Sequence, residues 1–498
     1  MRKSRRIKGA EKRLVIISNR LPVSVEREEG QWRLRPSSGG LVSALAPVLR
    51  DRGGLWIGWP GTLEDVDLDQ LLKASPQAGY GLKAVTLTPE ERDKFYYGFS
   101  NEIIWPLFHA LHTVCNFDPE YWTVYRAVNR KFADVVSDNV QSNDFLWVHD
   151  YHLMLLAQEL KKAKIKAPVG FFLHIPFPPP DIFLKLPWRT QIIDALLDYD
   201  FVGFQTSNFR QNFVQCVRAL EKQVTVSGKN PFTVMTVGQR EVRLGNFPIS
   251  IDFEQFASQA ASEEVAEMAW SIRERLPDRE LMIGVDRLDY TKGLPYKLDG
   301  FRLALERYEE LRTRISLIQV VVPSREEIPP YHDLRAEVER LVGKINGEFT
   351  ESGWVPIHYI FRHLDRDELL ALYRTAGIAL LTPLEDGMNL VAKEYCASSL
   401  DDEGVLILSE FTGTAEQMRK NALLVNPYER DQMADTIYQA YKMPMAERRS
   451  RMRKLRRSVQ EQDIFWWVDS FLKAAASSDL DAFPPRADEK LEEIVEYR

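Results

Sequence analysis

The segment Gly284–Leu294 carries two cations, Arg287 and Lys292, five residues apart and directly after a short apolar run. An arginine can bind two phosphate oxygens at once and a lysine supplies a compact charge, so this pair can hold a diphosphate. The same side chains could instead form ion pairs with Asp286 or Asp289. Spacing alone favours neither interpretation, so the anion clamp and the ion pairs both stay open.

A second candidate for phosphate or sugar binding is Leu384–Tyr395, which reads LEDGMNLVAKEY. Asp386 can accept hydrogen bonds from sugar hydroxyls, and the backbone N–H groups that follow it, before a helical stretch, can bind a phosphate. Glu394 stands two helical turns further on and can reach a ribose. The alternative is an ordinary helix N-terminus with Asp386 near the cap.

Two further segments could bind anions, with weaker support. Ser38–Leu41 places two glycines before the helical stretch Val42–Leu49, which suits either a phosphate loop or an ordinary flexible loop. Arg325 follows a predicted strand and could be another anion hook. Its neighbours Glu326 and Glu327 favour the simpler interpretation of a surface ion pair.

Polar residues end two predicted strands of the first half. Asp150, within His149–His152, is a candidate acceptor for a hydroxyl proton, and His174 stands before a proline-rich turn. His174 could equally be a buried, satisfied histidine. The pair His109 and His112 lacks the further ligands that zinc spacing requires, so no metal site is predicted. The chain also lacks GxGxxG and GxxxxGK[ST] motifs, which disfavours nicotinamide and P-loop chemistry.

An aromatic set accompanies the first loops: Trp56, Trp59, Tyr96 and Trp105. Tryptophans flanked by loops can serve as platforms for sugars, but most aromatic side chains belong to the core, and the core interpretation is favoured.

Short apolar runs alternate with amphipathic stretches, and βα alternation predicts parallel sheets. The predicted strands are Leu14–Ser18, Phe145–His149, Val169–His174, Phe201–Gln205, Leu281–Val285, Ile315–Val322, Ile357–Ile360, Ile378–Thr382 and Val405–Ser409. The predicted helices are Val42–Leu49, Tyr151–Lys162, Pro187–Leu197, Pro295–Arg312, Tyr331–Ile345, Asp367–Thr375 and Asp488–Arg498. We therefore expect two doubly wound α/β domains that join near Asn246–Asp252 and face each other across a cleft. Ligands bind beyond the carboxyl ends of such strands, which adds weight to Asn19, Arg20, Asp150, His174, Arg287, Arg325 and Asp386.

The composition is that of a globular protein of two or three domains. The chain has 498 residues, 45% hydrophobic and 28% charged, and its net charge is 65 − 72 = −7. These values exclude a disordered chain, a collagen-like repeat and a disulfide scaffold. Three separated cysteines, no long apolar run and no signal sequence predict a cytoplasmic protein without a membrane partner. The mild acidity argues against nucleic-acid binding, and the basic first residues are expected to form a solvated tail.

Seven motifs, in order between about residue 13 and residue 473, together resemble the trehalose-6-phosphate synthase family. They are Ser18–Arg20, Gly39–Leu41, Phe99–Pro106, Trp147–His152, His174–Pro178, Asp286–Gly293 and Asp386–Tyr395. The resemblance implies a GT-B fold of two Rossmann-like domains, with the last helix crossing back to the first. It also implies retaining transfer of glucose from a nucleoside diphosphate glucose to a sugar phosphate, without a required metal or other cofactor.

The resemblance assigns roles residue by residue. On the donor side it implies that Arg287 and Lys292 clamp the diphosphate, that Gly40 belongs to a glycine loop and that Glu394 binds the ribose. It also implies contacts to glucose and phosphate from the segment Asp386, Gly387, Met388, Asn389 and Leu390. His174 matches the residue near the glucose 6-hydroxyl and the anomeric carbon. On the acceptor side Arg20 and Arg325 match phosphate hooks, and Trp59, Tyr96, Trp105 and Asp150 match the pocket. The family implies attack on the face that the diphosphate leaves, so Asp150 positions a hydroxyl and is not a nucleophile.

Several positions depart from the family pattern. Glu385 replaces the usual Arg beside the donor phosphates, and Leu364 stands where some members have an aromatic near the nucleobase. Pro180–Arg189 looks more like the related glucosylglycerol-phosphate synthases, whereas Arg325 favours the trehalose-type acceptor pocket. UDP, ADP or GDP therefore stays open as the donor nucleotide.

We expect a small-molecule enzyme that forms α,α-trehalose 6-phosphate from glucose 6-phosphate and a nucleoside diphosphate glucose, most simply UDP-glucose. The alternatives are glucosylglycerol-phosphate synthesis from ADP-glucose and glycerol 3-phosphate, a catalytically silent sugar-phosphate sensor, and phosphorylase-like chemistry, for which no pyridoxal phosphate motif is seen. A homo-oligomer is expected. The predicted domains are an acceptor domain at 13–249, completed by a helix at about 460–475, and a nucleotide-sugar domain at 250–459, with tails at 1–12 and 476–498.

Overall fold

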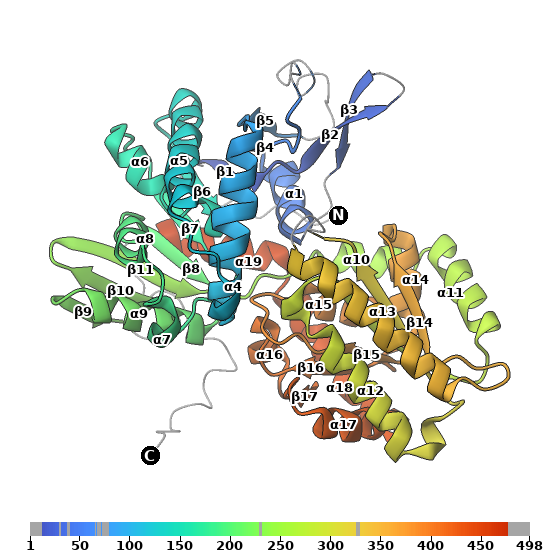
Figure 1. Cartoon of the computed structure of the whole chain (residues 1–498). Helices are drawn as coiled ribbons and strands as arrows, with labels where there is room; N and C mark the ends of the chain where they lie inside the picture. The colour runs from blue at the N-terminus through green and yellow to red at the C-terminus, as the bar shows by residue number, and fades with distance from the viewer. Residues whose placement is uncertain are drawn as a thin grey trace. The chain divides into compact units, whose positions relative to one another are not determined.

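The computed structural model describes residues 12–28, 31–36, 40–64, 66, 71, 79–228, 232–324 and 329–476 (Figure 1). The basic tail, Ser38, Gly39, Arg325 and the predicted helix Asp488–Arg498 lie outside these residues. The chain forms two compact units, one of residues 1–247 and 468–498 and the other of residues 248–467. The chain passes from the first unit to the second between residues 247 and 248, two residues before the predicted join at 249–250. It returns to the first unit between residues 467 and 468.

The first unit contains a nine-stranded sheet with the order β5-β4-β1-β6-β7-β8-β11-β10-β9. Its strands are β1 (Arg13–Arg20), β4 (Leu55–Trp59), β5 (Gly81–Ala84), β6 (Asp144–His149), β7 (Val169–Phe172), β8 (Phe201–Phe204), β9 (Val224–Ser227), β10 (Phe232–Val237) and β11 (Arg240–Asn246). Neighbours from β5 to β11 pair in parallel, and β9 and β10 pair antiparallel at one edge. A separate hairpin joins β2 (Val23–Glu28) to β3 (Gln31–Pro36).

The helices of this unit connect the parallel strands. They are α1 (Gly40–Arg52), α3 (Pro89–Glu91), α4 (Trp105–Phe108), α5 (Pro119–Asn139), α6 (Leu156–Lys162), α7 (Pro180–Phe183), α8 (Arg189–Leu196) and α9 (Ser207–Leu220), with a π-helix at Arg92–Ile104. The returning segment is part of α19 (Ile464–Ala476), whose Phe471 stacks on Trp147 with ring centroids 4.3 Å apart. This approach requires Gly203, since a Cβ there would lie 2.8 Å from the Phe471 ring.

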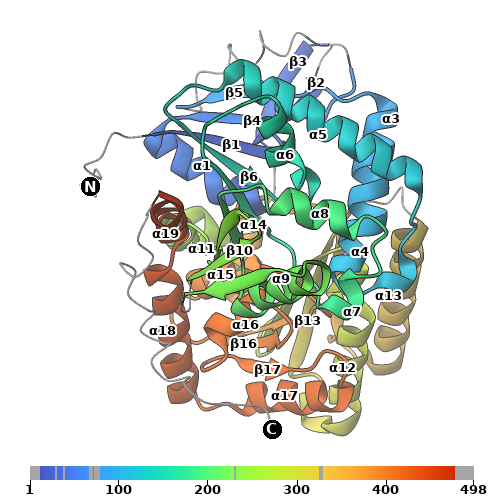
Figure 2. The same cartoon turned by 90° about the vertical axis from the view of Figure 1, so that its left-hand side faces the viewer.

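The second unit contains a six-stranded parallel sheet with the order β14-β13-β12-β15-β16-β17. Its strands are β12 (Glu280–Arg287), β13 (Ile315–Val322), β14 (Ile357–Phe361), β15 (Ile378–Leu381), β16 (Val405–Ser409) and β17 (Leu423–Val425). Its helices are α10 (Phe253–Ala260), α11 (Glu263–Arg275), α12 (Leu294–Arg307), α13 (Pro329–Phe349), α14 (Arg366–Thr375), α15 (Leu390–Ser398), α16 (Gly413–Met418), α17 (Arg430–Lys442) and α18 (Met445–Glu461). Helices α12 and α17 pack side by side in both views (Figures 1 and 2).

Both sheets have the strand sequence of a doubly wound nucleotide-binding fold. Numbered in chain order, the second sheet runs 3-2-1-4-5-6, and the first six parallel strands of the first sheet follow the same order. The strand order reverses between β1 and β6 in the first unit and between β12 and β15 in the second. Ligands bind beyond the carboxyl ends of the strands at such a switch point. The predicted α/β class with doubly wound sheets is confirmed.

Two predicted helices are wrong in extent. The stretch Tyr151–Lys162 is a short 3-10 turn followed by α6, because side chains of α5 bond the backbone groups that a continuous helix would pair. Tyr125 Oη accepts from Met154 N at 3.1 Å, and Asn129 Oδ1 accepts from Leu155 N at 3.3 Å. Likewise α12 stops at Arg307, short of the predicted Arg312, where Tyr308 stacks on Tyr438 of α17 at 4.0 Å.

Within the residues described here, no helix is both long and apolar enough to cross a membrane. The three cysteines, Cys115, Cys216 and Cys396, are all free thiols.

Candidate active site

The switch point of the second unit brings together the two segments predicted to bind a nucleotide sugar. Arg287 is the last residue of β12, and Asp386 follows the neighbouring strand β15. Lys292 Nζ donates to Asp386 Oδ2 at 2.6 Å, and both side chains are largely buried. Leu384 N donates to Thr291 O at 2.8 Å. The predicted clamp and the predicted glucose-binding loop are therefore one connected structure, although 94 residues separate Lys292 from Asp386.

The turn after Asp386 prepares the start of α15. Asp386 Oδ1 accepts from the N–H groups of Met388, at 3.1 Å, and Asn389, at 3.3 Å. Asn389 adopts a left-handed conformation (φ 52°) and its Oδ1 accepts from Ala392 N, so Asn389 is the helix cap. Within the described part of the chain, the N–H groups of Leu390 and Val391 have no hydrogen-bond acceptor. A helix start with such N–H groups suits an anion.

The two acids next to Arg287 in the sequence make different contacts. Asp286 is buried. It accepts hydrogen bonds from Lys297 Nζ and, at 3.0 Å, from Gln319 Nε2, so its contacts lie in the interior of the unit. Asp289 Oδ2 lies 3.8 Å from Arg287 Nη2, and the Arg287 side chain stays 46% exposed. Asp289 thus contacts the guanidinium at long range, and the exposed part of the Arg287 side chain can contact a ligand.

Glu394 lies on α15, where Tyr373 Oη donates to its Oε2 at 3.1 Å. Burial raises the pKa of this carboxyl, and Tyr373 and Arg366 partly offset the effect. Arg366 stacks over the Phe256 ring at 4.3 Å, and its Nε and Nη2 are buried without a partner among the described residues. A carboxylate and an arginine held in this way are suited to hydroxyls and a flat ring, as a nucleoside provides.

Glu385, the departure from the family pattern, is a mostly buried carboxyl next to Asp386. Burial and the charge of Asp386 raise its pKa to about 7. Its proximity also contributes to the raised pKa of Tyr428. Near neutral pH, Glu385 therefore changes charge beside the predicted phosphate-binding residues.

We expect Glu385→Gln to change how stability depends on pH. Below pH 7 the folded protein holds a proton that the unfolded chain releases near the ordinary carboxyl value, so stability falls as pH rises from about 4.5 to about 7. The neutral glutamine removes this loss, which is on the order of 3 kcal/mol for a pKa raised from 4.5 to about 7. Thermal melts should show the variant several degrees more stable than the parent at pH 8 and equal to it near pH 4.5. Glu309→Gln, at an exposed position, is the control, and a pH-independent difference for Glu385→Gln would contradict the assignment.

The switch point of the first unit carries Arg20 at the end of β1. Its guanidinium lies over the Trp59 ring at 4.7 Å, and Trp59 lies 6.3 Å from Tyr96, which stacks on His152 at 5.9 Å. Burial lowers the pKa of Arg20, and no carboxylate among the described residues pairs with it. A half-buried cation in an aromatic surrounding is a suitable hook for a phosphate.

Asp150 follows β6 at the same switch point and has a positive φ of 74° with a ψ of 168°. Its Oδ1 accepts from His174 N at 3.2 Å, so the loops after β6 and β7 are joined. Non-glycine residues in such a conformation cluster at functional sites.

His174 belongs to a buried chain of polar groups. With Gln205 Nε2 donating to His174 Nδ1 at 3.3 Å, the proton of the ring lies on Nε2, 3.1 Å from His149 Nδ1. Burial lowers the pKa of His174 to about 3 and holds that of His149 well below its usual value. His174 is therefore a neutral hydrogen-bonding group near pH 7, and its role beside the glucose stays a prediction.

The aromatic set is mainly core, as favoured. Trp59 is 3% and Trp105 6% exposed, and Trp56 is fully buried in β4, a strand that the sequence analysis missed. Trp59 Nε1 donates to Thr62 O, and Trp105 packs on His109 at 4.2 Å. Pocket roles for Trp59, Tyr96 and Trp105 stay predictions.

The remaining predicted positions are placed only in part. Gly40 is the first residue of α1 in the first unit, whereas the other donor residues, apart from His174, belong to the second. Arg325, with Ser38 and Gly39 of the glycine loop, lies outside the described residues. The sequence did not reveal the supporting roles of Tyr373 and Gln205, because their partners Glu394 and His174 are distant in the sequence. Asp289 was considered only as an ion-pair partner of Arg287.

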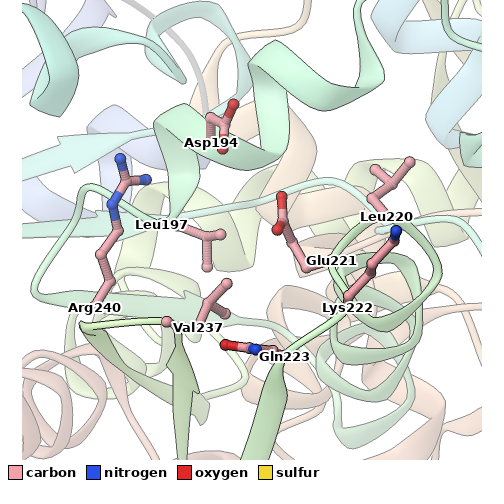
Figure 3. Close-up of a pocket in the computed structure, with 9 residues that line it drawn as sticks. Asp194, Leu197, Leu220, Glu221, Lys222, Gln223, Val237 and Arg240 are labelled. Atoms are coloured by element: carbon pink, nitrogen blue, oxygen red, sulfur yellow. The ribbon is translucent and has the colours of Figure 1, made fainter.

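A cavity of about 600 Å³ in the first unit lies apart from these residues (Figure 3). Asp194 and Leu197 from the α8 region, residues 220–223 and the β10–β11 turn with Arg240 surround it. None of its lining residues belongs to the predicted site. The described residues also hold no cluster of three or more histidine, cysteine, aspartate or glutamate side chains able to bind a metal.

Two Rossmann-type sheets, with cations and a helix start at the switch point of one and an arginine among aromatics at the other, are the architecture of a GT-B glycosyltransferase. The family model of glycosyltransferase family 20 matches residues 12–477. The chain belongs to this family, and the resemblance noted from its motifs is confirmed.

Relatives with names and solved structures agree with this assignment. The trehalose-6-phosphate synthase of Mycobacterium leprae is 42% identical over 471 residues, covering 93% of this chain and 94% of the relative. A UDP-forming α,α-trehalose-phosphate synthase from Burkholderia xenovorans, solved with glucose 6-phosphate, is 33% identical with a TM-score of 0.84, covering 93% of this chain and all of that one. A structure from E. coli with UDP-2-fluoro glucose is 35% identical with a TM-score of 0.83, covering 95% and 100%.

Proposed function

We propose that this glycosyltransferase moves glucose from UDP-glucose to glucose 6-phosphate with retention, forming α,α-trehalose 6-phosphate and UDP. The observation that carries the proposal is that Arg287, at the end of β12, and the ion pair of Lys292 with Asp386 lie at the switch point of the second unit. The substrates named for the Burkholderia xenovorans and E. coli structures support the choice of acceptor and donor.

The donor residues are those of the second unit. Arg287, Lys292 and the first N–H groups of α15 bind the diphosphate, and Asp386 accepts hydrogen bonds from glucose hydroxyls. Glu394 accepts from the ribose. Because Lys292 Nζ donates to Asp386 Oδ2, a donor that contacts both side chains has to replace this ion pair with its own phosphate and hydroxyl groups.

The acceptor residues are those of the first unit. Arg20 binds the phosphate of glucose 6-phosphate, and the Trp59 and Tyr96 rings limit the space around it. Asp150 orients an acceptor hydroxyl, and its bond to His174 N keeps the carboxylate in place. Arg325 is proposed as a second phosphate hook.

The chemical step breaks the bond between C1 of glucose and the diphosphate oxygen. Negative charge grows on the leaving diphosphate, and fixed cations with helix N–H groups stabilise it, often the largest contribution to catalysis. The leaving oxygen accepts the proton of the attacking hydroxyl on the same face, which retains the configuration. We propose that Arg287 and Lys292 supply the positive charge, so that no metal is required.

Arg20→Ala should raise the KM for glucose 6-phosphate by about 10- to 100-fold, because a hydrogen bond to a charged group contributes about 1.5–3 kcal/mol. The KM for the donor should stay within about threefold, since Arg20 belongs to the other unit. Steady-state kinetics with each substrate varied in turn measures the effect. Arg130→Ala, at an exposed position on α5, is the control, and an unchanged acceptor KM in Arg20→Ala would remove Arg20 from the phosphate site.

A crossed assay tests the proposed function. UDP-, ADP- and GDP-glucose are each combined with glucose 6-phosphate and with glycerol 3-phosphate, and products are identified by mass. A hexose disaccharide phosphate from UDP-glucose supports the proposal. Glucosylglycerol phosphate as the main product would overturn the acceptor, and no product in any combination would favour a sugar-phosphate sensor. Homo-oligomerisation and a cytoplasmic location stay predictions.

A further inference from the structure

We propose that Asp289 is a positioning residue that sets the direction of both cations of the clamp, Arg287 and Lys292. The inference rests on the proposed function of these cations, and it concerns a residue that would touch neither substrate. Asp289 stands between the two cations in the chain and is fully buried.

Asp289 fixes the backbone of the turn that carries Lys292. Asp289 Oδ1 accepts from Thr291 N at 3.0 Å and from Thr291 Oγ1 at 2.9 Å, so it caps the 3-10 turn Tyr290–Lys292. The carbonyl of Asp289 accepts from Lys292 N at 3.0 Å. Three bonds from one residue thus set the backbone from which the Lys292 side chain starts.

Asp289 also contacts the side chain of Arg287. Asp289 Oδ2 lies 3.8 Å from Arg287 Nη2, within ion-pair range but beyond a hydrogen bond. A half-exposed arginine has many rotamers, and a carboxylate at this distance favours those that turn the guanidinium toward Lys292's turn. The Arg287 side chain stays 46% exposed, so a ligand can reach it.

The negative charge of Asp289 should weaken the binding of an anion at this site. A buried negative charge near a diphosphate site repels the ligand, and burying it costs free energy unless hydrogen bonds and a cation compensate. An acid here is therefore useful for geometry and unfavourable for attraction. A positioning role can therefore be distinguished from a binding role. Without the charge of Asp289, the site should bind the diphosphate at least as tightly but hold it in a less productive geometry.

Asp289→Asn tests the inference, because asparagine keeps an oxygen for Thr291 and loses the charge that steers Arg287. We expect kcat to fall at least tenfold, while the Kd for UDP, measured by calorimetry, stays within threefold of the parent or becomes tighter. Equal melting temperatures confirm that the fold is intact. Asp299→Asn, an acid of α12 paired with Arg430 at the surface, is the matched control and should leave both values unchanged.

Two results would overturn the proposal: an unchanged kcat, or a loss of UDP affinity in proportion to the loss of kcat. If Asp289→Asn does not fold, Thr291→Val replaces it, since valine keeps the shape and removes only the hydroxyl donor. A threefold or larger loss of kcat with unchanged UDP affinity supports positioning, and an unchanged kcat overturns it. Failure of the proposed function is recognised separately, because the parent protein would then neither bind UDP nor transfer glucose.

Discussion

Arg287→Ala should lower kcat for glucose transfer by about 100- to 1000-fold while the protein stays folded, the effect of removing one preorganised group that stabilises charge in a transition state. The guanidinium is 46% exposed, and Asp289 Oδ1 keeps its hydrogen bonds to Thr291 when the guanidinium is removed, so we expect the fold to survive the substitution. Steady-state rates and a thermal melt of the same preparation measure the two quantities. Arg287→Lys should recover part of the rate, since lysine restores charge without the planar fork.

The control for this variant is Arg430→Ala, which removes a half-exposed arginine of the same unit that pairs with Asp299. We expect its rate to equal that of the parent. Full activity in Arg287→Ala would refute the clamp, and a lowered melting temperature with a matching loss of activity would assign Arg287 a structural role instead.

Asp386→Asn should separate binding of the leaving group from binding of glucose. Asp386 Oδ2 accepts from Lys292 Nζ at 2.6 Å, so the diphosphate has to compete with a carboxylate for this cation. Removing the charge should tighten the binding of UDP by about two- to tenfold. The lost contact to glucose hydroxyls should lower kcat/KM for UDP-glucose by about 10- to 100-fold, from about 1.5–3 kcal/mol per hydrogen bond to a charged group.

Calorimetry with UDP and steady-state kinetics with UDP-glucose check the two opposite effects in one variant. Asp431→Asn, at an exposed position paired with Arg307, is the control. Weaker UDP binding in Asp386→Asn would mean that Asp386 organises the phosphate site through the N–H groups of Met388 and Asn389 and does not compete for Lys292.

The elements that carry the site could be predicted because each has a local signal. The apolar runs that end at Val285 and Thr382 predicted β12 and β15, and polar residues directly after them predicted the position of Arg287 and Asp386. The alternation of strands and helices was sufficient to predict two doubly wound sheets. Identification of the family needed the motifs themselves, since the periodicity of the chain is shared by many α/β proteins.

What could not be predicted depends on contacts between distant segments. No local pattern shows that Lys292 binds Asp386 or that Tyr373 donates to Glu394. The break at Met154–Leu155 arises because Tyr125 and Asn129, on another helix, accept hydrogen bonds from the N–H groups of these two residues. Strand β4 was missed because its residues, LWIGW, resemble a loop rich in glycine and tryptophan.

The most direct test of the proposed reaction is the structure of its product. UDP-glucose and glucose 6-phosphate are incubated with purified protein in the presence of EDTA, and the product is examined by NMR. We expect a disaccharide phosphate with both anomeric protons in the α configuration, formed at the same rate with and without EDTA. A β linkage, or a rate that collapses on chelation, would contradict retaining transfer supported by Arg287 and Lys292.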